Sequence, residues 1–121
     1  MAGKFRLSVR TSLLSVYSDS AGAVGLFELS SQFASKGSLG AVLAQLPGVR
    51  FDDQSQSLWS RGRDRFTFKD RAYVISAPHG DVRVAPAEDG AVYRETAELL
   101  SALKEQLLPL WQTRRTRFYR T

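Results

Sequence analysis

The segment FTFKDRAYVISAPHGDVRVA, at residues 66–85, decides the fold class. It holds three short runs rich in β-branched and aromatic residues, at 66–68, 72–76 and 82–85, separated by turn-forming residues. Runs of this length and composition are typical of strands. Connections this tight are too short for a crossover between parallel strands, so the segment predicts an antiparallel meander.

Further strand-like runs precede this segment. Residues 49–51 and 58–60 continue the same spacing toward the N-terminus. Near the start of the chain, apolar and basic residues alternate over 4–10, which predicts a half-buried strand that can run on to Tyr17. Residues 18–22 then have turn composition, and a strand over residues 24–29 can pair back as a hairpin. The whole chain predicts about five to seven short strands.

Two segments have helical rather than strand periodicity. Apolar residues recur at spacings of three and four over residues 38–46, with Ser38 as the expected N-cap and Pro47-Gly48 as the stop. A longer stripe predicts a helix near residues 90–108, which Pro109 ends or kinks. The members of the longer stripe are Val92, Thr96, Leu99, Leu103, Leu107 and Leu110.

These elements predict an α+β fold. A single, mainly antiparallel sheet would carry the short helix and the long C-terminal helix on one of its faces. The length of 121 residues fits one domain, and the chain has no repeat and no linker that would separate two. It can bury a core without metals or disulfides.

The composition excludes several classes of protein. The absence of cysteine excludes disulfides, iron–sulfur clusters and thiol catalysis. No apolar run approaches the roughly 20 residues that a membrane-spanning helix needs. The sequence also lacks the pattern of a secretory signal, so a cytoplasmic protein is the default expectation.

The positive charge is concentrated at the C-terminus. The chain has 17 basic and 12 acidic residues, and residues 113–121 contain four arginines and no acid. The remainder is therefore nearly neutral, with 13 basic residues against 12 acidic ones. We divide the chain into a domain at residues 1–112 and a basic, aromatic tail at residues 113–121.

The tail supplies the first set of candidate binding residues. Arginine neutralises phosphate or acidic side chains, and aromatic rings stack on bases or anchor protein interfaces. The composition therefore fits a protein contact, self-association, nucleic acid, or packing on its own domain. The candidates are Trp111, Arg114, Arg115, Arg117, Phe118, Tyr119 and Arg120.

A second set lies in the basic stretch at residues 61–71. If the chain were extended here, one face would carry a cationic stripe made of Arg61, Arg63, Arg65 and Lys69. We expect Gly62 and Asp64 to turn the chain instead, which would scatter the stripe at a hairpin tip. Either way, we expect Phe66 and Phe68 to face the core rather than to stack on bases.

His79 is the only histidine, and Asp81 follows two residues later. A carboxylate beside an imidazole could support general base catalysis. The flanking Pro78 and Gly80 are also what an ordinary exposed loop contains, and this is the interpretation we prefer. With one histidine and no cysteine, we expect no metal site and no cofactor.

The sequence therefore predicts a small non-enzymatic binding or adaptor protein. Its arginine-rich and aromatic surface would meet an acidic protein partner or a second copy of the chain. The first alternative is a nucleic-acid-binding protein that uses the tail and the stretch at residues 61–71. The second is a small-ligand binder or enzyme that uses His79 and Asp81.

Overall fold

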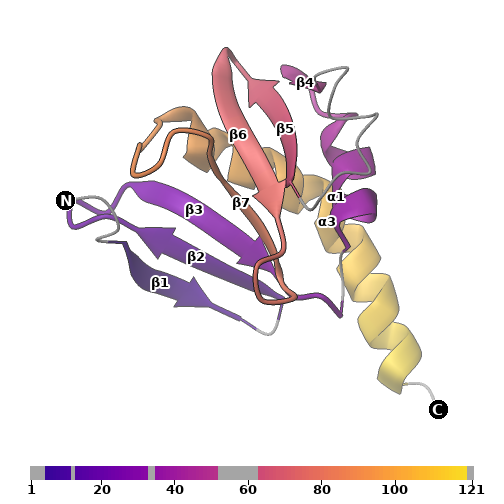
Figure 1. Cartoon of the computed structure of the whole chain (residues 1–121). Helices are drawn as coiled ribbons and strands as arrows, with labels where there is room; N and C mark the ends of the chain where they lie inside the picture. The colour runs from indigo at the N-terminus through magenta and orange to yellow at the C-terminus, as the bar shows by residue number, and fades with distance from the viewer. Residues whose placement is uncertain (1–4, 12, 33–34, 52–62, 120–121) are drawn as a thin grey trace.

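A seven-stranded antiparallel sheet forms the body of the protein (Figure 1). The structure is a computed structural model that describes residues 5–11, 13–32, 35–51 and 63–119. The strands follow each other across the sheet in the order β1-β2-β3-β7-β6-β5-β4. Their bounds are β1 (Arg6–Arg10), β2 (Leu14–Ser18), β3 (Val24–Leu29), β4 (Val49–Phe51), β5 (Arg63–Phe68), β6 (Arg71–Ser76) and β7 (Val82–Pro86).

The sheet consists of two meanders joined side by side. One contains β1, β2 and β3, and the other contains β4 to β7. They meet where β3 pairs with β7, through the partners Phe27↔Val84, Glu28↔Arg83 and Leu29↔Val82. The chain passes from the centre of the sheet to its far edge through α1 (Lys36–Leu43). The predicted α+β class and antiparallel meander are therefore confirmed.

Local chemistry explains the turns. The β5–β6 hairpin turns at Lys69 and Asp70, whose φ angles of 50° and 68° are both positive. Two consecutive positive φ angles match the right-handed twist of a tight hairpin. In the β2–β3 turn, the Asp19 carboxylate accepts hydrogen bonds of 2.9 Å from the backbone N–H groups of Ala21 and Ala23. Such side-chain bonds satisfy donors that a loop would leave unpaired.

Helix α1 begins three residues earlier than its sequence pattern indicated. Ser35, not Ser38, is the N-cap, and its hydroxyl accepts a 3.1 Å hydrogen bond from the Ser38 backbone N–H. The Ser38 hydroxyl accepts in return from the Ser35 backbone N–H at 2.9 Å. This reciprocal pair is a capping box with serine in place of the usual glutamate. Leu39, Leu43 and Leu46 are buried, as the periodicity predicted.

Helix α3 (Glu95–Tyr119) has different ends from the predicted helix near residues 90–108. Val92 lies before its start, and Pro109 does not end it. A proline removes a single backbone donor from a helix, and the residues that follow include leucine, glutamine and arginine, which favour helix. The predicted apolar stripe is confirmed where the side chains are described, because Thr96, Leu99, Leu103 and Leu107 are buried.

The core lies between α1, α3 and one face of the sheet, which we call the inner face. It contains 17 buried apolar side chains, including Phe66 and Phe68 as predicted. At its centre, the hydroxyls of Tyr73 and Thr96 form a 2.9 Å hydrogen bond, and both residues are 0% exposed. Burial raises the pKa of Tyr73 above its ordinary value. This pair ties α3 to the middle of the sheet.

The strand expected at the N-terminal end of the chain differs from the one observed. The strand expected over residues 4–10 does not continue to Tyr17, because the chain reverses after Arg10 and β2 pairs back on β1. The predicted alternation puts Leu7 on the same face as Val9, but a bulge between them places Leu7 opposite Tyr17, on the face away from the described helices, where it is 44% exposed. The predicted strand at residues 58–60 lies outside the described residues.

Candidate interaction surface

The C-terminal candidates belong to α3 rather than to a separate coil. The backbone is helical through Tyr119, and Figure 1 shows this end of α3 extending past the sheet. By helical spacing, positions 111, 114, 115 and 118 fall on one stripe. Arg120 and the side chains of the other tail candidates lie outside what the structure describes. Their role stays a prediction, and so does the division between residues 1–112 and 113–121.

The described part of the basic stretch is a strand over Arg63–Phe68, so the turn expected at Asp64 is wrong, whereas Gly62 lies outside the described residues. Strand β5 starts at Arg63 and pairs through Asp64 with β6, and the turn comes later, at Lys69. Pairing of six consecutive residues outweighs the low strand propensity of a single aspartate. Arg61 lies outside the described residues, as does the Arg63 side chain. Arg65 is exposed on β5, opposite Val74.

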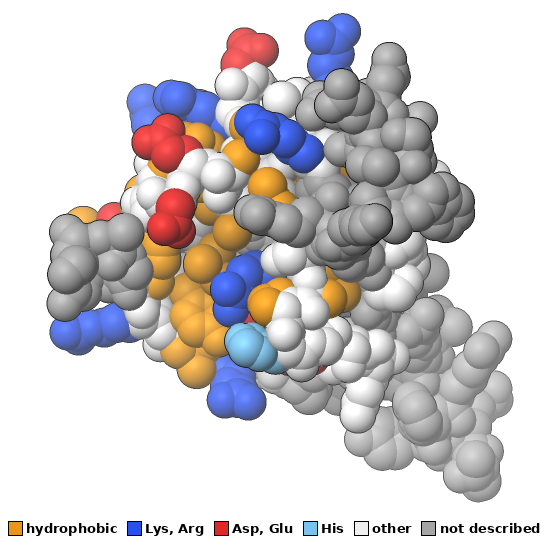
Figure 2. Space-filling view, in the orientation of Figure 1, with side chains coloured by type: hydrophobic (Ala, Val, Ile, Leu, Met, Phe, Trp, Pro, Cys, Tyr) orange, Lys and Arg blue, Asp and Glu red, His pale blue; other side chains and the backbone are white. Residues whose placement is uncertain are grey.

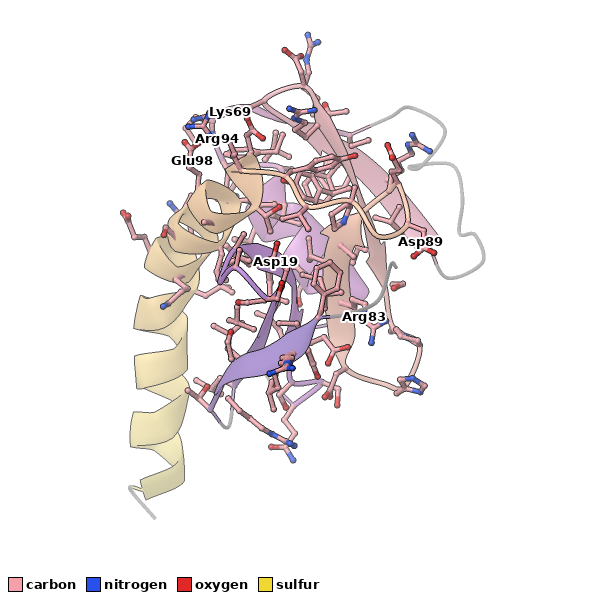
Figure 3. All side chains as sticks on the ribbon, turned by 90° about the vertical axis from the view of Figure 1, so that its left-hand side faces the viewer. Asp19, Lys69, Arg83, Asp89, Arg94 and Glu98 are labelled. Atoms are coloured by element: carbon pink, nitrogen blue, oxygen red, sulfur yellow. The ribbon has the colours of Figure 1, made fainter. Side chains whose placement is uncertain are left out.

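The cations at the end of this hairpin are neutralised within the protein. Lys69 forms an ion pair with Glu98, and Figure 3 shows these two side chains together at the start of α3. Arg71 forms a 3.3 Å ion pair with Glu95 and lies over the Tyr93 ring, with 5.0 Å between the guanidinium carbon and the ring centroid. Acidic residues in the first helical turn also complement the helix dipole. These contacts attach the hairpin to α3.

The face of the sheet turned away from both helices, which we call the outer face, gathers arginines from distant parts of the chain. Neither of the described helices covers it (Figure 1). Strand pairing places Arg10 opposite Ser15, Ser15 opposite Glu28, and Glu28 opposite Arg83. Arg50 occupies the same face at the other sheet edge, opposite Thr67, and Arg65 lies between.

Arg83 has an acidic partner on the same face, Glu28. Arg83 donates from Nε and Nη2 to the same oxygen, Oε2, of Glu28, at 2.8 and 2.7 Å. The Tyr17 hydroxyl donates to Oε1 of Glu28 at 3.3 Å. Burial, followed by the negative charge of Glu28, raises the pKa of Tyr17. Neither Arg10 nor Arg50 forms an ion pair with a described residue.

An apolar row runs beside the arginines. Leu7 pairs with Tyr17 and Tyr17 with Leu26, so these three side chains lie next to one another on the outer face. Tyr17 and Leu26 are partly buried, and Leu7 is exposed. In Figure 2, hydrophobic side chains spread over this part of the sheet, with basic side chains among and around them. The outer face therefore combines cationic and apolar groups.

The structure gives Asp81 a structural contact. It places His79 in the exposed turn between β6 and β7, and the Asp81 carboxylate accepts a 3.2 Å hydrogen bond from the Ser31 backbone N–H. That bond connects the turn to the end of β3. Between His79 and Asp81 themselves, both of which are described, the structure shows no hydrogen bond.

The described residues contain neither a cluster suited to a metal ion nor a helix suited to a membrane. Among them, no three histidine, cysteine, aspartate or glutamate side chains are grouped so as to hold a metal ion. Within the same residues, no helix has both the length and the apolar character needed to span a bilayer.

Comparison with known proteins gives no further guide to the surface. The chain matches no protein-family model, no curated protein and no solved structure.

Sequence reasoning missed Arg10, Arg50 and Arg83 as site residues. Each alternates with apolar neighbours, so each was expected at a solvated strand position. That they share one face follows only from the order of the strands. The pairing of β3 with β7, 55 residues apart for Glu28 and Arg83, is what brings the N-terminal and C-terminal strands together.

Proposed function

We propose that this chain is a small non-enzymatic binding module whose outer face meets an acidic protein partner. The observation that carries the proposal is the row of arginines that runs from β1 to β4 across a face that neither α1 nor α3 covers. Arginine and tyrosine are enriched among the residues that dominate protein interfaces. We keep the cytoplasmic location expected from the sequence as part of this proposal.

Two features favour protein over nucleic acid as the partner. The apolar row of Leu7, Tyr17 and Leu26 would be buried by a protein but not by a phosphate backbone. Glu28 sits within the face, where its carboxylate would repel phosphate. We retain the basic residues 113–121 in this proposal as a second contact, with the acidic partner or with a second copy of the chain.

The test compares capture of binding proteins from native lysate by three forms of the full chain. These are the wild type, the outer-face variant R10E/R50E, and the control R94E, which reverses a charge beside the Lys69–Glu98 pair, away from Arg83 (Figure 3). We expect nuclease-treated lysate to yield acidic proteins that bind the wild type and R94E but are lost from R10E/R50E. Equal loss from both variants would contradict the proposal.

A salt titration separates the nucleic-acid alternative. Binding to phosphate should fall steeply between about 50 and 200 mM salt, whatever the sequence offered, because counterions are released. An interface with an apolar centre should weaken much less over the same range. Capture that disappears after nuclease treatment would also favour nucleic acid.

A further inference from the structure

Strand β1 forms one edge of the described sheet. In the described sheet, β1 pairs with β2 on one side and with no strand on the other. An edge strand presents unpaired backbone N–H and C=O groups, which can pair with another chain. The opposite edge, β4, has three residues, whereas β1 has five. The β1 edge is therefore the better template for an added strand.

A bulge in β1 directs its two arginines to different faces. The register shifts between Leu7 and Val9, so that Arg6 pairs with Ser18 while Arg10 pairs with Ser15. Arg6 lines a groove on the inner face, and Arg10 lies on the outer face, opposite Ser15 and near Tyr17. Both arginines are exposed, and neither pairs with an acid in the described part of the chain.

The groove beside β1 has a volume of about 700 Å³. Leu14, Val16 and Leu100 supply its apolar lining, and Arg6 and Lys104 add positive charge. Side chains of a strand added to β1 would alternate between the mouth of this groove and the exposed Leu7 on the outer face. An apolar residue therefore has a place to pack on either side of the sheet.

Charge decides against a second copy as the added strand. Strand β1 carries two arginines and no acid, so pairing with a second β1 would bring four arginines to one seam. Like charges that face each other across a strand pair destabilise it. An acidic strand turns the same positions into two favourable pairs.

We propose that the β1 edge binds an extended, acidic segment of a partner protein as an eighth strand. This inference rests on the proposed function, because it describes how the acidic partner of that function would bind. On β2, the residues opposite the two arginines, Ser18 and Ser15, are three apart. A strand added on the other side should likewise carry acids three residues apart, with apolar residues between them.

The probe is the synthetic peptide acetyl-Ser-Thr-Glu-Val-Val-Glu-Thr-Ser-amide. The first control peptide replaces both glutamates with lysine, and the second carries N-methyl groups on both valines. N-methylation keeps the charge and the side chains but removes donors needed for strand pairing. Binding is measured by NMR titration and by amide hydrogen exchange of the full chain.

We expect the acidic peptide to slow exchange of the β1 amides, and both control peptides to fail. The variant R6E/R10E should weaken binding about tenfold, as loss of two exposed ion pairs implies, whereas R94E should not. Since both Arg6 and Arg10 are exposed, the variant R6E/R10E should fold normally.

Other outcomes overturn the inference. It is wrong if the N-methylated peptide binds equally well, if bound peptide leaves the β1 amides unprotected, or if no binding occurs at millimolar peptide. Protection of β1 that rises with protein concentration alone would identify a second copy as the occupant. In all these cases the proposed function survives if R10E/R50E still abolishes capture of acidic proteins, so the two failures are distinguishable.

Discussion

Basic side chains have different surroundings at the two ends of the sheet. At the β5–β6 hairpin, Lys69 and Arg71 pair with acids in the first turn of α3, and an aromatic ring lies against Arg71. At β1, Arg6 and Arg10 pair with no acid among the described residues. Net charge does not show this difference. It arises because the start of α3 reaches one end of the sheet and not the other.

The contrast separates two uses of arginine within one fold. Where a helix supplies carboxylates, the cation contributes to the attachment of helix to sheet. Where none is supplied, the cation is available to a partner. We call the end of the sheet where the β5–β6 hairpin contacts α3 the docked end. Substitutions there should change the stability of the fold, whereas substitutions at the β1 end should change partner binding.

The largest difference should come from apolar residues at the two ends. Phe66 is 0% exposed and stacks on Tyr73 with 5.5 Å between ring centroids, whereas Leu7 is 44% exposed. We expect Phe66→Ala to lower the free energy of unfolding by about 3–5 kcal/mol. Leu7→Ala should change it by less than about 0.5 kcal/mol. Urea unfolding followed by circular dichroism measures both, and similar losses would remove the distinction between the two ends.

The buried hydroxyl pair gives the next effect. Tyr73→Phe leaves the Thr96 hydroxyl buried without its partner, which should destabilise the protein by about 1–3 kcal/mol. The double variant Tyr73→Phe/Thr96→Val removes both polar groups and should recover part of that loss. If the double variant is less stable than the single one, by thermal unfolding, the hydrogen bond is not what makes the pair stabilising.

On the outer face, Glu28→Gln should have a smaller effect, about 1 kcal/mol, because it weakens the bond to Arg83 without creating a cavity. It should also lower the pKa of Tyr17, since the Glu28 charge disfavours the phenolate. Ultraviolet titration of this variant against the same variant carrying Tyr17→Phe isolates the change. An unchanged Tyr17 pKa would place Glu28 too far away to act on it.

The smallest effect concerns Glu95 at the docked end. A hydrogen bond from its own backbone N–H lowers the pKa of Glu95 below the ordinary value of 4.5, and Arg71 lowers it further. A carboxylate with a lowered pKa stabilises the fold above its unfolded-state pKa, and this stability is lost as pH falls through the folded-state value. Glu95→Gln should therefore lower the melting temperature at pH 7, and the difference from wild type should shrink as pH falls below 4.5 and vanish below the folded-state pKa of Glu95. A constant difference at all pH values would contradict this origin.

Sequence reasoning recovers the parts of this protein that depend on local patterns. The stripe from Thr96 to Leu107, the core-facing Phe66 and the separator at Lys69-Asp70 all follow from periodicity and turn composition. The burial of Leu7 was wrongly expected because alternation does not reveal the bulge in β1, which puts Leu7 on the outer face. Of the two outcomes expected at Pro109, an end of the helix is wrong, because one lost donor does not outweigh a run of good helix formers.

The candidate surface was much less predictable. Arg10, Arg50 and Arg83 lie far apart in the sequence, and only the pairing of β3 with β7 and the strand order place them on one face. Conversely, the basic residues of the 61–71 stretch were predicted to bind a partner because they are close in sequence. Two of its cations, Lys69 and Arg71, are paired with acids of α3.

The junction between β3 and β7 also has a consequence for how the chain folds. Each meander can assemble from neighbouring hairpins, but the junction joins residues 55 positions apart and closes a long loop. Loop closure of this kind slows folding, so we place it in the rate-limiting step. Changes at Phe27 or Val84 should then slow refolding, whereas changes in the edge strand β1, outside the junction, should mainly speed unfolding.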